Sequence, residues 1–336
     1  MKTERAYTKK TFWEMNRRSG GYLLRKSIMR NVVSVLRWLL VFGLCFMIIQ
    51  PLIIRFVNSL KPEIDLYDPT VKLVPRTVTL ENYAIVLGLT DMPNSMLNTL
   101  WISFLTALCQ IVATTLVAYG FARYDFPLKK LWFACVIATI VIPPQAISSS
   151  LYNYFARFDV LGLFKLFTGS ARNLIGSPVP YVLMCLTCMG LKDGLYIYML
   201  RQYFRNVPKS LEEAAFVDGC GTLKTFVRIM LPDAMPIIVS CFLFAFVWQW
   251  TDVFYARNFL TSSYSIFANQ ISSIETKFGR TLAGVAQGSA STTVAPARSQ
   301  QLISIGVLVC SAPLIVLYLF AQRSFVESIS MTGTKM

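Results

Sequence analysis

Long apolar runs, separated by shorter polar segments, dominate the sequence. A helix that crosses a membrane needs about 20 mainly apolar residues, and six runs approach or reach that length. These runs are residues 38–57, 100–122, 131–147, 179–200, 236–254 and 302–320. The pattern predicts an all-α, multi-pass protein of the lipid bilayer, with six transmembrane helices and both chain ends on one side of the membrane.

Composition and charge indicate which side that is. Of the 336 residues, 55% are hydrophobic and 15% are charged, with a mean hydropathy of +0.53. With the amino terminus inside, 21 Lys and Arg residues lie inside and 10 lie in the outer loops, while Arg55 sits at the outer membrane edge. This positive-inside bias predicts that both termini are cytoplasmic. The net charge of +15 suits anionic lipid, whereas nucleic-acid binding would need a basic soluble domain that the sequence lacks.

The runs divide the chain into three parts. Residues 1–37 form a basic cytoplasmic tail, which is too long, and too far ahead of its apolar run, for a cleaved signal peptide. Residues 38–326 form the transmembrane domain, with an inner segment at 208–232 and a long outer loop at 255–301, and residues 327–336 form a cytoplasmic tail. The outer loop contains the Ser-, Thr- and Ala-rich piece "GSASTTVAPARSQ", which predicts flexible surface. Its length favours a binding role only slightly over disorder.

Several kinds of chemistry are excluded by the residues themselves. The sequence has no histidine, which removes histidine acid catalysis, Ser-His triads and histidine metal sites. Cys185 and Cys188 have C-x-x-C spacing, but they lie in an apolar run without a second pair, so packing is the better interpretation. The sequence also lacks a G-x-x-x-x-G-K-[ST] phosphate loop. If the protein uses ATP, another chain must bind it.

The inner segment predicts a pair of short helices. Ser210 and Glu213 have capping-box spacing, so a helix is expected to begin at Ser210 with reciprocal side-chain bonds. The small residues Ala214 and Ala215 would allow another surface to come close, and Gly219 suits a left-handed helix terminus.

The second helix of the pair is expected to begin at Thr222, and Pro232 and Pro236 are expected to mark the turn into the fifth run. Its apolar residues recur at helical spacing and are Leu223, Phe226, Val227 and Met230. An ordered pair on the inner face, too short to be a domain, is typical of a docking element. Periodicity alone does not separate this from an amphipathic segment lying on the membrane surface.

The same segment carries a resemblance to a known family. Glu213-Ala214-Ala215, then Gly219, then Ile229 to Pro232, fits E-A-A-x3-G-x9-I-x-L-P, the signature of permease subunits of ATP-binding-cassette importers. "TLENYAIVL", "NSMLNTLWIS", "AYGFARYDFP", "LRQYFRNVPKSLEEAAFVDG" and "YLFAQRSFV" are similar to the second, six-span permease of maltose and multiple-sugar importers. The similarity covers roughly residues 70–326. Cys220 replaces the usual alanine, Asp233 follows the proline, and residues 165–172 resemble a small insertion.

The resemblance implies a fold of the type I importer permease and a function in sugar import. It implies three partners: a cytoplasmic ATPase dimer that receives the inner segment, a second permease subunit of different sequence, and an extracytoplasmic sugar-binding protein. The chain itself is expected in the cytoplasmic membrane of a bacterium. The chain itself would carry no cofactor, because ATP and Mg²⁺ would be bound by the ATPase. The residues expected to couple to that ATPase are Glu213, Ala214, Ala215, Gly219, Leu223, Phe226, Ile229, Leu231 and Pro232.

Candidate substrate-pathway residues lie in the fourth and fifth runs. Lys192 and Asp193 fall near the middle of a span, where a charge must be paired or face water. An ion pair to a neighbouring helix is an equally good interpretation, and two adjacent residues on a helix would not face the same way. In "WQWTD", Trp248, Gln249 and Asp252 combine a flat apolar face with hydrogen-bonding groups, as a sugar requires.

Two rival functions remain at this point. A permease of the same family could carry another solute, because the coupling motif does not specify cargo. A gradient-driven secondary transporter or channel would predict inverted repeats, broken helices with facing polar groups, or rings of acidic residues, and the sequence gives no convincing case of any. An enzyme is the least supported class.

Overall fold

The computed structural model describes residues 15–17, 19–71, 74–160, 162, 165–166, 169–260, 264–285 and 295–333. In this described part the regular secondary structure is helical, apart from one isolated bridge between Phe158 and Arg172. The chain divides into two units, Met1–Thr79 and Leu80–Met336. Each unit is described by itself.

The first unit consists of a long apolar helix and a short segment held by a network of polar contacts. Helix α2 (Tyr22–Ser59) exposes apolar side chains along most of its length, as a helix that faces lipid does. It begins within the predicted tail, so the last part of residues 1–37 continues the first span as one helix.

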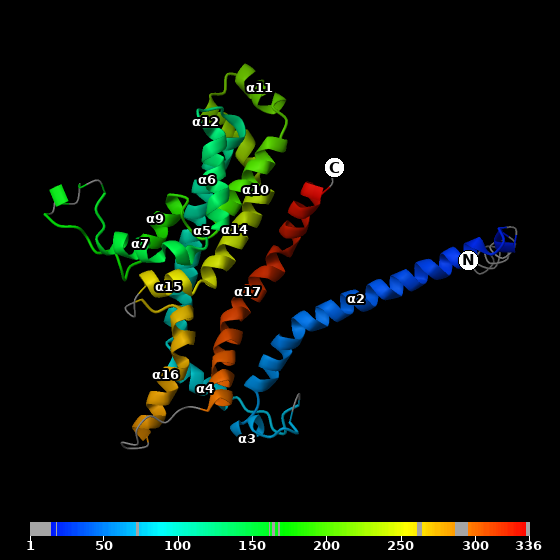
Figure 1. The fold of residues 1–336 in the computed structure, drawn as a ribbon, viewed down its shortest axis with the longest axis vertical. Coiled ribbons are helices and arrows are strands. Elements are labelled where there is room, and N and C mark those ends of the chain that lie inside the picture. The colour runs from blue at the N-terminus through cyan, green and yellow to red at the C-terminus, as the bar shows by residue number, and fades with distance from the viewer. Residues whose placement is uncertain are drawn as a thin grey trace. The chain divides into compact units, whose positions relative to one another are not determined.

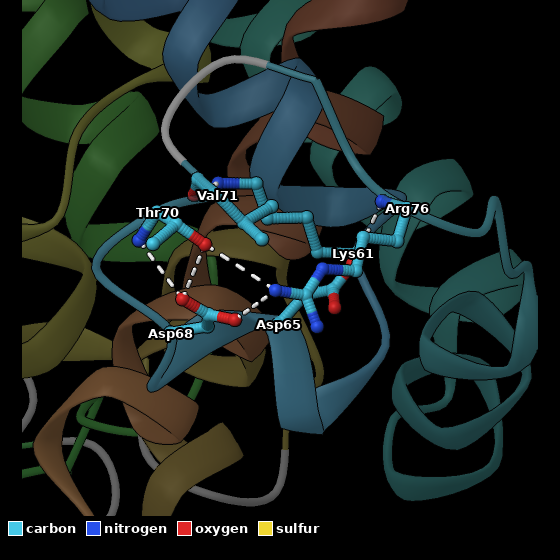
Figure 2. A network of polar contacts seen from close by, with 6 residues as sticks. All are labelled: Lys61, Asp65, Asp68, Thr70, Val71 and Arg76. Carbon is cyan, nitrogen blue, oxygen red and sulfur yellow. Dashed lines mark hydrogen bonds and ion pairs between the residues drawn. The ribbon is translucent and has the colours of Figure 1, made fainter.

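The polar network follows α2, joins residues between Lys61 and Arg76, and includes α3 (Glu63–Leu66). Figure 2 shows Lys61 Nζ donating to the carbonyl oxygen of Val71 at 3.0 Å, and the Arg76 amide donating to Asp65 Oδ2 at 2.9 Å. Asp68 accepts hydrogen bonds from the Thr70 amide and hydroxyl and forms an ion pair with the Arg76 guanidinium. The Thr70 hydrogen bonds and the Arg76 charge hold the pKa of Asp68 below its ordinary value.

The second unit is a bundle of helices around α5 (Figure 1). Its longer helices are α5 (Met92–Arg123), α6 (Lys129–Val141), α7 (Pro144–Ala156), α10 (Asp193–Asn206), α14 (Met235–Trp250), α16 (Phe267–Val285) and α17 (Pro296–Gly333). The shorter elements are α4 (Glu81–Leu89), α9 (Val179–Leu186), α11 (Ser210–Val217), α12 (Thr222–Thr225), the π-helical turn η1 (Phe226–Met230), α13 (Leu231–Asp233) and α15 (Phe254–Phe259).

Helix α5 is the centre of this bundle and packs against α9, α10, α14 and α16. One face of α5 carries buried polar side chains, most of them small hydroxyls, which lets the neighbouring helices approach closely. The residues are Ser95, Thr99, Ser103, Thr106, Gln110 and Thr114. Several hydroxyls donate to a carbonyl four residues earlier, for example Thr106 to Ile102 at 2.6 Å. These hydroxyls are satisfied within the helix, whereas the Gln110 amide donates to the Leu191 carbonyl oxygen outside it.

The helices confirm part of the predicted span pattern. Within the residues that the structure describes, three helices are long and apolar enough to cross a membrane: Leu24–Ser59, Met92–Arg123 and Pro296–Gln322. They contain the first, second and sixth predicted runs. Two bent pairs, α6 with α7 and α12–α13 with α14, would raise the number in the described chain to five. The finding is therefore an all-helical protein with three to five candidate spans.

The predicted third run, 131–147, is not one straight helix. Helix α6 ends at Val141 and α7 begins at Pro144, and the two axes differ by 101°. Pro143 follows Ile142 and disfavours helical geometry at that residue, which is extended with ψ 119°. Pro144 then begins the next helix, a position where its missing N–H costs nothing.

The predicted fourth run, 179–200, is also interrupted, so the expectation of a single helix was wrong. Helix α9 ends in a Schellman motif, in which the Cys188 amide bonds to Cys185 and the Met189 amide to Met184. Cys188 has φ 56° and Lys192 has φ 69°, so residues without glycine's freedom adopt the left-handed conformation on both sides of the break. Hydropathy does not detect such a break because most of its residues are apolar.

Gly194 fixes the packing of α10 after the break. A Cβ atom placed there would lie 2.8 Å from the Val136 carbonyl oxygen on α6, closer than real Cβ contacts. Gly194 therefore permits a close crossing of α10 and α6.

The predicted outer loop, 255–301, contains helices rather than irregular chain. It includes most of α15, all of α16 and the first residues of α17. Most of the Ser-, Thr- and Ala-rich piece lies outside the described residues. Arg298, at the start of α17, is buried and donates to Asn82 Oδ1 at 2.7 Å and Gln301 Oε1 at 2.6 Å. The amphipathic face of α16 packs on α17, which is why this segment folds.

Candidate coupling segment and translocation pathway

Helix α11 begins differently from the prediction. Lys209 occupies the N-cap position, and its carbonyl accepts the amides of Glu212 and Glu213, both at 3.0 Å. Ser210 is already the first helical residue and forms no capping bond. The predicted capping box between Ser210 and Glu213 is therefore wrong, because the helix starts one residue earlier than the box requires.

The end of α11 confirms the role predicted for Gly219. Gly219 has φ 77°, which a residue with a side chain adopts only at a cost. Its amide donates to Phe216 at 3.0 Å, and the Cys220 amide donates to Ala215 at 2.9 Å. These two bonds form a complete Schellman motif. Gly219 thus ends α11 and turns the chain toward α12.

The second short helix begins at Gly221 as N-cap, so the cap predicted at Thr222 is wrong. It passes into the π-helical turn η1, after which the Leu231 amide bonds to the Phe226 carbonyl five residues earlier. Pro232 lies inside α13, and the chain turns into α14 at Ala234, between Pro232 and Pro236, as predicted. The segment from Thr222 to Asp233 then meets α14 at 76°.

The predicted apolar stripe on this helix divides between two directions. Phe226 and Met230 are buried, with 6% and 1% of their surface exposed, and pack in the core of the unit. Leu223 and Val227 are exposed at 73% and 50%. An exposed pair of this kind is available for contact with another molecule.

Exposed apolar side chains occur on both short helices. Leu211, Phe216 and Val217 on α11 are exposed, as are Leu223 on α12 and Val227 on η1. Among the other predicted coupling residues, Glu213, Ala214, Gly219 and Pro232 are exposed, Ile229 and Leu231 are half-buried, and Ala215 is buried. The predicted set therefore contains both surface residues and residues that hold the pair in place.

Glu212 is a residue of this site that the sequence reasoning did not single out. Its carboxylate is buried, accepts a hydrogen bond from Tyr119 Oη at 2.8 Å, and lies 3.2 Å from Arg123 Nε. The Arg123 side chain is 5% exposed and also donates to the Val207 carbonyl oxygen at 2.9 Å. The Nε–H is not aligned for a hydrogen bond to Glu212, so this contact is an ion pair. In the sequence, the only hint of these contacts to Glu212 is that Tyr119 and Arg123 are four residues apart and so share one helix face.

Aromatic rings surround the same contact. The Tyr119 ring lies 4.6 Å from Phe226, 5.4 Å from Phe204 and 5.8 Å from Tyr124, measured between centroids. Edge-on and tilted pairs of this kind exclude water from the polar groups that they enclose. Helices α5, α10 and η1 therefore meet around Tyr119.

The structure brings Lys192 and Trp248 together at the break between α9 and α10. Lys192 Nζ lies 5.0 Å from the centroid of the Trp248 ring, within the range of a cation–π interaction. Both side chains are exposed. Asp193 is buried and accepts the Gly190 amide. The two residues therefore face different ways, as predicted, although they lie at a helix start instead of within a helix.

The polar groups behind this pair link α5, α14 and the break. Gln110 Nε2 donates to the Leu191 carbonyl oxygen at 2.6 Å, and Gln249 Nε2 lies 3.5 Å from Gln110 Oε1. Gln110 and Gln249 are both buried, so Gln249 lies behind Trp248 and not beside it on the exposed surface.

Asp252, the last predicted pathway residue, lies just before α15 and binds amides at its start. It accepts Tyr181 Oη at 2.7 Å, and the amides of Phe254 and Ala256 at 3.1 and 3.2 Å. These bonds satisfy both carboxylate oxygens at the amino terminus of α15. They favour a structural role for Asp252 over contact with substrate.

The described chain thus combines candidate membrane spans, an exposed and ordered helix pair, and a broken helix beside which a cation and an indole are exposed. The family model for the "Binding-protein-dependent transport system inner membrane component" matches residues 110–330. The chain belongs to this family. It is therefore a multi-pass inner-membrane component of a transport system, and the family description implies a binding protein and an ATPase as partners.

Curated relatives and a solved structure agree with this assignment. The chain is 35% identical over 211 residues to the osmoprotective compounds uptake permease protein GgtD of Synechocystis sp., a match that covers 61% of this chain and 65% of GgtD. It is 27% identical over 285 residues to the trehalose transport system permease protein SugB of Mycobacterium tuberculosis, covering 85% of this chain and 92% of SugB. A crystal structure of a bacterial ABC transporter involved in the import of the acidic polysaccharide alginate has the same fold. Its TM-score is 0.66, with 16% identity over 87% of this chain and 96% of that chain.

Proposed function

We propose that the chain is the membrane permease of an ATP-driven importer of a sugar or oligosaccharide, and that it forms half of the translocation pathway. The observation that carries the proposal is the exposed pair α11–α12, which presents Glu213, Ala214 and apolar side chains at the spacing of the importer motif. Relatives named for trehalose, arabinooligosaccharides and melibiose, raffinose and stachyose support the sugar class.

In this proposal the chain binds no ATP itself and is moved by a partner ATPase. A cytoplasmic ATPase dimer binds ATP and Mg²⁺ and contacts α11–α12 through Glu213, Ala214, Leu223 and Val227. Gly219 keeps the two helices at a fixed angle, because its left-handed geometry ends α11 at one residue. Closing of the ATPase would then bias the bundle between two states, one open to each side of the membrane.

The membrane topology belongs to the same proposal. Six spans, with both termini in the cytoplasm of a bacterium, follow if α2, α5, α14 and α17 each cross the membrane and if α6–α7 and α9–α10 each cross as a broken helix. The positive-inside distribution supports this orientation. A second permease subunit of different sequence and an extracytoplasmic sugar-binding protein would complete the assembly.

The proposed pathway contact is the Lys192–Trp248 pair. An indole face suits the C–H face of a sugar, and an ammonium group donates hydrogen bonds to hydroxyl oxygens. Both groups are exposed at the break. A weak contact of this kind suits transport, because a substrate held tightly within the membrane would leave slowly.

A permease for a different small solute is the second candidate, and the likeness to a permease named for osmoprotective compounds favours it. Purification of the chain with its ATPase, followed by ATPase assays with the binding protein and a panel of sugars and compatible solutes, separates the two. A sugar that stimulates ATP hydrolysis supports the first. Stimulation by a non-sugar solute alone supports the second, and failure to associate with any ATPase overturns both.

A further inference from the structure

We propose that Glu212 is the residue through which movement of α11 is transmitted to α5. The proposal rests on the proposed function, since it assumes that an ATPase moves α11. It concerns the Glu212 junction, defined as the Glu212 carboxylate, Tyr119 Oη, the Arg123 guanidinium and the Val207 carbonyl oxygen.

Helix α11 has few other attachments to the bundle. Of its eight residues, Glu212 and Ala215 are the buried ones, and Ala215 contributes only a methyl group. A force applied to the exposed side of α11 therefore reaches the bundle mainly through the Glu212 side chain and the two chain connections. Figure 1 shows α11 beyond the ends of α10 and α12, at the far end of this unit from α4 and α16.

The junction joins α11 to the last turn of α5. Tyr119 and Arg123 lie four residues apart and so share one face of that helix. Glu212 Oε1 accepts from Tyr119 at 2.8 Å, and Glu212 Oε2 lies 3.2 Å from Arg123 Nε. Arg123 also holds the end of α10 through Val207 at 2.9 Å. One hydrogen bond and one ion pair, made by different carboxylate oxygens of Glu212, therefore hold α11 against the end of α5.

The apolar contact beside the junction does not do the same. Phe226 packs on the Tyr119 ring at 4.6 Å, but ring contacts tolerate sliding, because dispersion and burial are not directional. The ion pair is buried, so leaving either partner alone exposes an uncompensated charge to an apolar surrounding. Among the ion pairs in the described chain, this one has both side chains at 10% exposure or less. Its burial makes it sensitive to small displacements.

Helix α5 then carries the displacement to the break. From Arg123 to Gln110 is 13 residues of one uninterrupted helix, or about 20 Å at 1.5 Å per residue. Gln110 donates to the Leu191 carbonyl oxygen at 2.6 Å, immediately before Lys192. A movement of α5 therefore acts directly on the segment that positions the Lys192–Trp248 pair.

The test compares sugar transported per ATP hydrolysed in proteoliposomes that contain the assembled importer. Glu212→Gln keeps the acceptor for Tyr119 and removes the charge that faces Arg123. We expect the complex to assemble, because the exposed docking side chains are unchanged, and ATP hydrolysis to continue. Transport per ATP should fall about tenfold, because the buried Arg123 guanidinium then faces no opposite charge. A merely structural role would lower transport and hydrolysis together and leave their ratio unchanged.

Two further variants keep the proposal falsifiable if Glu212→Gln fails to assemble. Tyr119→Phe removes one hydroxyl, retains the ion pair, and should also lower the transport-to-hydrolysis ratio. Asp125→Asn is the matched control, because Asp125 forms an ion pair with Lys129 close to the same helix end but its side chain is 99% exposed. Its ratio should equal that of the wild type.

The outcomes separate the two proposals. A wild-type complex that shows no ATP-dependent uptake would contradict the proposed function before any variant is compared. A wild type that transports, with Glu212→Gln or Tyr119→Phe at the wild-type ratio in an assembled complex, would overturn the role of Glu212 alone.

Discussion

Replacing Gly219 by valine tests whether the angle between α11 and α12 is required for transport. Gly219 has φ 77°, and a Cβ atom placed there would have no neighbour within 4 Å. The substitution therefore causes backbone strain without a steric clash. A β-branched residue in the left-handed region costs about 1–2 kcal/mol, small against the stability of a whole bundle but similar to that of the two hydrogen bonds that end α11.

The expected result is loss of coupling with the fold retained. A cost of about 1.4 kcal/mol displaces a local equilibrium tenfold, so most molecules would lose the Schellman turn and the fixed direction of α12. We expect Gly219→Val to insert into the membrane normally and to lower ATP-dependent uptake about tenfold or more. Sugar binding by the external binding protein should be unchanged.

Two variants control for side-chain size and backbone conformation. Gly221→Thr adds a side chain of the same shape two residues away, where φ is −73° and the position is the N-cap of α12, so uptake should remain normal. Gly219→Asn should retain much of the uptake, since asparagine tolerates the left-handed region. Normal uptake by Gly219→Val would refute the reasoning, because the turn would then have no part in coupling.

The remaining predictions concern docking, topology and the pathway. Glu213→Lys should weaken co-purification of the ATPase by reversing an exposed charge in the first turn of α11, and unchanged recovery of the ATPase would contradict its place in the contact. A cysteine at Ser291, which lies outside the described residues, should react with an impermeant thiol reagent added outside, and one at Ser210 should not; the opposite labelling would overturn the charge argument. Trp248→Ala combined with Gln249→Ala should slow uptake or change sugar preference while the ATPase remains bound, and normal uptake across several sugars would remove both from the pathway.

The coupling segment was predictable where its signals are local. Gly219 was correctly placed because a left-handed helix terminus depends on one residue and its neighbours. The cap at Ser210 was not, because Lys209 already has helical geometry and accepts the first amides. Whether a helix begins at one residue or at its neighbour depends on the contacts of the whole helix. A rule based on residue spacing does not include those contacts.

The spans were predictable in composition but not in continuity. The apolar run 179–200 gives no warning that Cys188 and Lys192 adopt left-handed geometry, since that conformation is rare for such residues. Glu212 was overlooked for a related reason. It stands beside Glu213 in the chain, and only the arrival of Tyr119 and Arg123 from the end of α5 makes one carboxylate buried and the other exposed.

The central claim is that the chain converts ATP-driven movement of α11–α12 into passage of a sugar. Uptake of a radiolabelled sugar into proteoliposomes containing the complete importer tests it most directly, with ATP enclosed or omitted and with ionophores present or absent. The account predicts uptake that requires enclosed ATP and the binding protein, and that continues when ionophores abolish every ion gradient. Uptake without ATP that ionophores abolish would contradict the account and indicate a gradient-driven transporter.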